Sequence, residues 1–125
     1  MLETVARELA ELGIEARVVS WNGAGGAGVV FQLRAPSGRL KGRTLQIGLS
    51  FQENAYPEYP PHFVHFHQEE VEGTEFTRHS EHGFEGALWW AFSFPPSDFW
   101  DGLDPPQKNM RTFVRRHLYR VLEQL

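Results

Sequence analysis

Four histidines near the middle of the chain are the side chains best suited to acid–base or metal chemistry. His65 and His67 stand two residues apart in an apolar run, so on a strand both would point to one face. Together with His79 and His82 they supply enough imidazole nitrogens for a zinc site. No carboxylate or further histidine stands at a spacing typical of metalloenzymes. A zinc-dependent hydrolase is therefore kept only as a distant alternative for the function of this chain. No metal or other cofactor is predicted.

Nucleophiles are scarce in this sequence. The chain has no cysteine, which excludes disulfides and a thiol nucleophile. Ser93 lacks the flanking glycines of a nucleophile elbow, which disfavours a serine hydrolase. Glycines 23, 25 and 28 match the spacing of a dinucleotide-binding loop, but a β-rich run follows them instead of a helix. Residues 22–28 are therefore interpreted as a flexible hairpin loop.

Composition and charge narrow the class of protein. The 125 residues, of which 41% are hydrophobic and 22% charged, fit one globular domain over residues 1–125. Lys and Arg number 12 against 16 Asp and Glu, a net charge of −4, so nucleic acid is not an expected partner. No stretch approaches the roughly 20 apolar residues of a membrane span, and the N-terminus does not resemble a signal peptide. These features predict a cytoplasmic protein that does not contact a membrane.

Hydrophobic periodicity predicts the elements that position these side chains. Apolar residues at helical spacing from Leu2 to Ala10 predict a first helix, which Gly13 is placed to end. A second helix is predicted from Met110 to Leu125, with Asn109 as its N-cap. Between them, β-rich runs over residues 17–21, 29–35, 44–51 and 63–67 predict strands. The predicted fold is α+β: an N-terminal helix, a four-stranded antiparallel meander and a C-terminal helix, with the helices on one face.

The stretch from residue 68 to residue 104 shows no sustained period and is predicted to be irregular. So long an irregular segment in a small domain is usually functional, so we expect the active-site loop there. Its first part is acidic, whereas the predicted C-terminal helix is basic; the helix carries Lys108, Arg111, Arg115, Arg116 and Arg120. Two interpretations remain open: both are solvated faces, or the basic helix docks an acidic protein partner.

The hexapeptide Tyr-Pro-Glu-Tyr-Pro-Pro, at residues 56–61, separates the third and fourth predicted strands. Its adjacent prolines stiffen the connection, and the bond between Pro60 and Pro61 is predicted to be cis. Tyr-Pro-x-x-Pro-Pro at this place in a helix-first meander resembles the ubiquitin-conjugating enzyme fold, including its bacterial relatives from ubiquitin-like conjugation operons. The order of elements agrees from Leu2 to Leu125. The resemblance implies a protein that accepts a ubiquitin-like modifier from an activating enzyme and transfers it to a target protein.

The resemblance also implies where the reaction would occur. In the family a His-Pro-Asn motif precedes a glycine and the catalytic cysteine, which is commonly followed by leucine. Here His79-Ser80-Glu81 stands where the family has His-Pro-Asn. Gly-Ala-Leu at residues 86–88 resembles the family's glycine, cysteine and leucine, which puts Ala87 at the nucleophile position. If the family's distance from the histidine to the cysteine is counted from His79 instead, Trp89 stands at the nucleophile position. Glu81 replaces the family's asparagine, and a carboxylate would oppose the negative charge of an oxyanion.

Three explanations of the missing thiol remain open. The chain is a noncatalytic variant that binds a ubiquitin-like protein or an activating enzyme. Alternatively, Ser93 or Ser97 acts as the nucleophile with a histidine as its base. Alternatively, Ala87 replaces a catalytic cysteine.

The resemblance implies two further sets of site residues. The groups expected to take up the acceptor's proton are His79, His82 and Asp98. The residues expected to contact partner proteins are Tyr56, Pro60, Pro61, Trp89, Trp100 and Arg115. Aromatic side chains such as these anchor interfaces where they are exposed.

Overall fold

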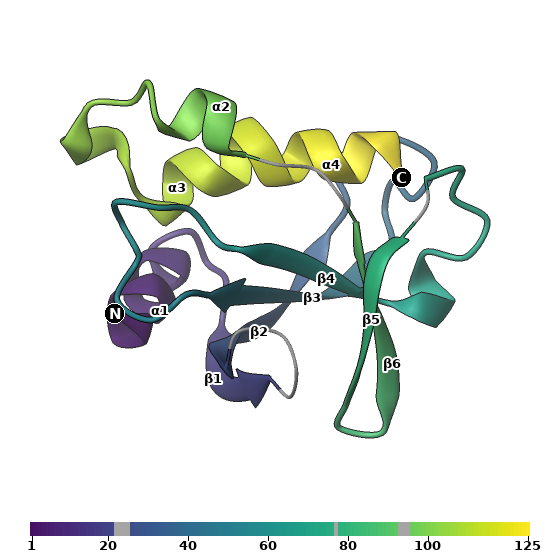
Figure 1. The fold of residues 1–125 in the computed structure, drawn as a ribbon. Coiled ribbons are helices and arrows are strands. Elements are labelled where there is room, and N and C mark those ends of the chain that lie inside the picture. The colour runs from purple at the N-terminus through teal and green to yellow at the C-terminus, as the bar shows by residue number, and fades with distance from the viewer. Residues whose placement is uncertain (22–25, 77, 93–95) are drawn as a thin grey trace.

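The strands form one antiparallel sheet, and the helices pack on one of its faces (Figure 1). The computed structural model describes residues 1–21, 26–76, 78–92 and 96–125, which contain six strands in the sheet order β1-β2-β3-β4-β6-β5. The strands are β1 (Ala16–Trp21), β2 (Gly26–Arg34), β3 (Thr44–Phe51), β4 (Phe63–His67), β5 (Arg78–Phe84) and β6 (Ala87–Phe92). The predicted α+β class is confirmed. The prediction of a four-stranded sheet was wrong, because two further strands extend it.

The two terminal helices lie close to their predicted positions. The first, α1 (Leu2–Ala10), is followed by Gly13 with a φ of +79°. The C-terminal helix runs from Met110 to Gln124 as α3 (Met110–Phe113), a π-helical turn (Val114–Leu118) and α4 (Tyr119–Gln124). Asn109 caps it as predicted, because its Oδ1 accepts a hydrogen bond from the Thr112 N–H at 2.9 Å.

The segment predicted to be irregular contains β5, β6 and a short helix, α2 (Ser97–Trp100), as well as 3₁₀ turns at Gln68–Glu70 and Pro105–Gln107. β5 escaped prediction because it is almost entirely polar and because a register shift between Arg78 and Ser80 breaks its alternation. The turn that joins β5 to β6 also lacks the usual Asn-Gly signal. Glu85 and Gly86 form it, with φ values of +49° and +76°, as a tight hairpin turn requires.

β2 also begins earlier than predicted. Residues 26–28, predicted to be loop, pair with β1, and residues 27 and 28 also pair with β3. Three small residues carry little β-propensity, so pairing with the neighbouring strands fixes their conformation. Residues 22–25, the rest of the predicted loop, lie outside the described part of the chain.

The main hydrophobic core lies between the helices and one face of the sheet. Its strand residues include Val29 and Phe31 of β2, and its helix residues come from α1 and the C-terminal helix. The fully buried members are Val5, Leu9, Val29, Leu40, Ile47, Leu49, Phe66, Val71, Trp100, Met110, Phe113, Leu118 and Leu122. The apolar stripe of each terminal helix is therefore used to cover the sheet. No helix in the described ranges is long and apolar enough to cross a membrane.

The β5–β6 hairpin curls over the opposite face of the sheet. Val30 follows Val29 on β2 and therefore points away from the helices. It is buried in a second cluster with Val19 of β1 and Trp89 of β6. At the tip of the hairpin, Arg17 of β1 donates two hydrogen bonds to the Glu85 carboxylate, one of them at 2.6 Å. Figure 1 shows the hairpin at a steep angle to β3 and β4. The hairpin thus encloses part of the face opposite the described helices.

The connection between β3 and β4 is attached to the helices by hydrogen bonds. The Tyr56 hydroxyl donates to Glu8 Oε1, which also accepts from the Met110 N–H at 3.0 Å. The Trp100 indole N–H donates to the carbonyls of Pro57 at 3.0 Å and Glu58 at 3.2 Å. Burial, followed by the hydrogen bond to Glu8, raises the pKa of Tyr56 above its usual range. Its hydroxyl therefore remains a donor.

One detail of this connection was predicted wrongly. The cis peptide bond precedes Pro57, not Pro61. Both bonds precede a proline and lie in the same six-residue connection.

Replacement of the shared acceptor at Glu8 is expected to destabilise the fold. Glu8→Ala leaves the Tyr56 hydroxyl and the Met110 N–H without their partner, and we expect a loss of about 2 to 3 kcal/mol in the free energy of unfolding. Urea denaturation followed by circular dichroism measures it. Glu11→Ala is the control, because it removes an exposed carboxylate three residues after Glu8. An equal loss of stability in both variants would contradict the role of Glu8.

Candidate functional site

The residues predicted to act together lie in two separate places. His79 and His82 lie on β5 and Ala87 begins β6, whereas Asp98 lies on α2 beside the C-terminal helix. Ser97 is the first residue of α2, and Ser93 lies outside the described residues. The structure therefore does not bring Asp98 to the hairpin.

Within the hairpin, the register separates the histidines from Ala87. Ala87 pairs with Phe84, and His82 pairs with Trp89, two residues farther along. His79 lies near Ala91, which at the rise of a strand is about 13 Å from Ala87. The arrangement of His79 beside Ala87 that a shared active site would need is not present along the hairpin.

The side chain of Ala87 is half-buried and packs against the cluster formed by Val19, Val30 and Trp89. Its neighbour Leu88 points to the other face of the hairpin and is 39% exposed. Trp89, which the alternative count put at the nucleophile position, is only 2% exposed. The hairpin thus presents an apolar side chain to solvent directly beside Ala87.

Several residues expected to contact partners are instead buried. Trp100 is 0% exposed and Tyr56 is 6% exposed, and both pack in the main core. Pro61 is buried as well, and Pro60 is half-buried. Of the six residues predicted to contact partners, only Arg115 is exposed. The aromatic residues that were predicted to anchor an interface are therefore core residues, because large aromatic side chains also contribute most to a hydrophobic core.

Four histidines surround Phe63 at the base of the hairpin. The ring of Phe63 lies 4.3 Å from that of His62, 5.4 Å from His79, 5.7 Å from His65 and 6.1 Å from His82, measured between centroids. His65 Nε2 lies 3.1 Å from His82 Nδ1, within hydrogen-bond distance. This histidine cluster joins β4 to β5 across the intervening β6.

His65 is the most strongly perturbed member of this cluster. It is fully buried, and its pKa falls from 6.5 to about 4, chiefly because burial disfavours the imidazolium. The positive charges that His82 and His62 can carry lower it further, and a hydrogen bond with the backbone of Gly48 opposes the change. At neutral pH the side chain of His65 is therefore uncharged.

The histidines do not form the zinc site that their spacing allowed. His67 packs edge-on against Trp89, with centroids 4.2 Å apart, and lies 3.5 Å from a Glu70 carboxylate oxygen. No group of three or more His, Asp or Glu side chains in the described part of the chain is arranged to hold a metal ion. His65 and His67 lie on β4, and His79 and His82 lie on β5, on the other side of β6. The faces of these rings pack around Phe63 and Trp89.

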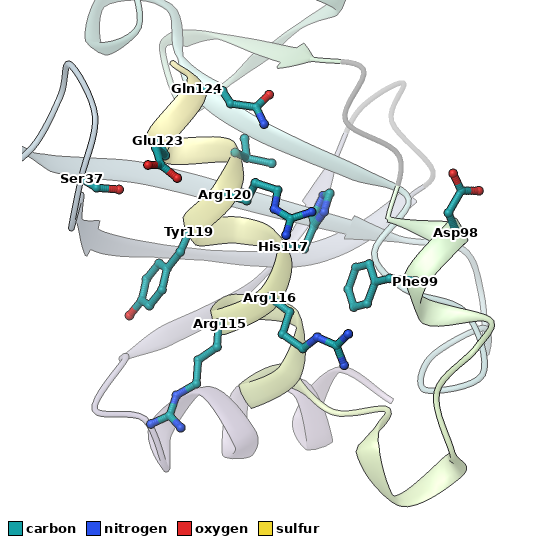
Figure 2. Close-up of a pocket in the computed structure, with 11 residues that line it drawn as sticks. Ser37, Asp98, Phe99, Arg115, Arg116, His117, Tyr119, Arg120, Glu123 and Gln124 are labelled. Atoms are coloured by element: carbon teal, nitrogen blue, oxygen red, sulfur yellow. The ribbon is translucent and has the colours of Figure 1, made fainter.

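An open cleft of about 660 Å³ runs along the exposed side of the C-terminal helix (Figure 2). Arg115, Arg116 and His117, which line it, belong to the π-helical turn, and Arg120 follows in α4. Figure 2 shows Arg116 and Arg120 on the side of Phe99 and His117, and Arg115 beside Tyr119. The sequence marked this helix as basic, but it gave no sign that α2 would supply Phe99 as the opposite wall.

A loop before β3 closes one end of the cleft. A Cβ atom on Gly38 would lie 2.5 Å from the Glu123 carbonyl oxygen, and the φ of Gly38 is +82°. Glycine is therefore required at this position. Arg39 Nε donates to the Leu125 carbonyl oxygen at 3.0 Å and holds the same loop to the end of the helix. These contacts place Ser37 in the wall of the cleft.

Comparison with known proteins gives no match: no family model, no curated protein and no solved structure is significantly similar to this chain.

The buried His65 makes the stability of the fold depend on pH. Because its pKa is lower in the folded chain, the unfolded chain takes up the proton first, so stability is complete above pH 6.5 and falls as the pH drops toward 4. We expect a loss of roughly 3 kcal/mol at the acid end. Urea titrations from pH 7.5 to 4 measure it.

A matched pair of variants isolates this effect. The acid-dependent part should shrink in His65→Gln and persist in His79→Gln, which removes an exposed histidine of the same cluster. An unchanged pH profile in His65→Gln would contradict the assignment.

Proposed function

We propose that the chain is a noncatalytic protein-binding module of ubiquitin-conjugating type, which binds a ubiquitin-like protein or its activating enzyme. Two features of the fold support this proposal. The helix at each end packs on the same face of the sheet, and the proline-rich bend at residues 56–61 joins the adjacent strands β3 and β4. These are the features on which the resemblance rests.

The observation that carries the noncatalytic assignment is the environment of Ala87. Its methyl group packs against Val19, Val30 and Trp89, and the chain has no cysteine. The two histidines that would serve as proton acceptors pack on Phe63 instead. A half-buried methyl group in this position contributes to packing and supplies no nucleophile.

The binding surface in this proposal is the outer side of the β5–β6 hairpin. Leu88 is exposed there, and the packing of Trp89 and Ala87 against Val19 and Val30 holds the hairpin in place. An apolar side chain on a fixed hairpin loses little conformational entropy when it enters an interface. Leu88 is therefore the expected anchor for the partner.

Truncation of this anchor should weaken binding. For Leu88→Ala we expect about a tenfold higher Kd, because the variant removes apolar area from the centre of the contact. Biolayer interferometry against purified ubiquitin and other ubiquitin-fold proteins measures the Kd. Tyr59→Ala is the control, because it removes an exposed apolar side chain from the bend at residues 56–61 and leaves the hairpin unchanged. Equal binding by wild type and Leu88→Ala would contradict the proposed surface.

The conjugating activity implied by the resemblance remains the second candidate, because Ala87 directly follows the exposed turn at residues 85–86. Ala87→Cys tests it in the presence of an activating enzyme, ubiquitin and ATP. The noncatalytic proposal predicts that no thioester forms, whereas an adduct that a thiol reductant removes would replace it with the conjugating function. Retained circular dichroism shows that the variant is folded.

A further inference from the structure

Three arginines in the cleft along the C-terminal helix have no acidic partner. Arg115, Arg116 and Arg120 are exposed, and among the described residues none of them lies within 4.0 Å of a carboxylate oxygen. The chain as a whole carries a net charge of −4. These guanidinium groups therefore do not serve to neutralise the described carboxylates of the same chain, although the chain is acidic.

The other groups that line the cleft leave its basic centre accessible. Asp98 and Glu123 contribute negative charge, and Figure 2 places them on opposite sides of Arg120. Between them, the Arg116 guanidinium lies over the ring of Phe99 at 5.4 Å, and Phe99 stacks on His117 at 5.8 Å. The ring contacts hold Arg116 in place while its N–H groups remain available to a ligand.

We infer that this cleft binds an acidic peptide segment of a partner protein. Carboxylates of the peptide pair with Arg116 and Arg120, since a planar guanidinium matches a carboxylate with two parallel hydrogen bonds. An apolar side chain of the peptide packs against Phe99. The volume of about 660 Å³ lies within the range of specific ligand sites, so a few residues of the peptide fill it.

The composition of the cleft favours a peptide over a polyphosphate chain. Its basic side chains are interleaved with the aromatic rings of Phe99 and Tyr119, which suits a ligand of mixed apolar and acidic character. A nucleic acid would bring a continuous row of phosphates past Asp98 and Glu123, whereas a short peptide can place its few carboxylates at Arg116 and Arg120. A second copy of this chain, docked through its acidic segment at residues 69–85, is an alternative occupant that the test separates.

Fluorescence anisotropy with a labelled peptide, Glu-Asp-Phe-Glu-Glu, tests the inference. We expect binding that weakens at least tenfold when Gln and Asn replace the acidic residues of the peptide. Arg116→Glu/Arg120→Glu should abolish binding, whereas Arg34→Glu/Arg43→Glu, with the same change of charge on exposed arginines elsewhere, should retain it. Arg120→Gln alone should weaken binding and serves if the double variant does not fold.

Several outcomes would overturn the inference. These are an absence of peptide binding to the wild type, an equal loss in the two double variants, and tighter binding of single-stranded DNA than of the peptide. Sedimentation that shows a dimer of the wild type but a monomer of Arg116→Glu/Arg120→Glu would assign the cleft to a second copy instead. The hairpin is unchanged in all of these variants, so the result is independent of the proposed function.

Discussion

One carboxylate connects the three parts of the chain that build the helical layer. Glu8 of α1 accepts hydrogen bonds from the bend between β3 and β4, through Tyr56, and from the start of the C-terminal helix, through Met110. These residues are 48 and 102 positions away in the sequence, so the contact forms only when the chain is folded. Both donors converge on one carboxylate oxygen, Oε1, and a charged acceptor makes stronger hydrogen bonds than a neutral one.

The bend and the C-terminal helix that Glu8 holds determine what the rest of the molecule presents. Trp100 packs against the bend, which fixes α2 and, with it, Phe99 and Asp98 at the edge of the cleft. On the other face of the sheet, the β5–β6 hairpin is held by different contacts, those of Trp89 and Arg17. The two surfaces of the sheet are therefore held by separate sets of side-chain contacts.

The sequence predicted those elements whose local signal agrees with their final environment. α1 and the C-terminal helix have a clear apolar stripe, and the Asn109 cap follows from its own residue type. β5 could not be predicted, because its polar side chains form an edge strand and its bulge removes the alternation. A strand of this kind is defined by its partner β6, and pairing is not visible in a local pattern.

The candidate site was predictable only by residue type. The histidines do gather, but the ring of Phe63 determines that they pack together and do not coordinate a metal ion. The basic character of the C-terminal helix was evident, whereas the wall supplied by Phe99 depends on how α2 docks.

The curled hairpin also affects how this sheet can meet other chains. β1 and β5 are the outer strands of the sheet, and the contact between Arg17 and Glu85 draws the hairpin tip to the opposite edge. Exposed outer strands are templates for unwanted strand addition and aggregation. β5 resists such addition through its bulge and the ion pair between Arg78 and Glu81. The register shift that hides β5 from a sequence pattern thereby also protects this edge of the sheet from pairing with the backbone of another chain.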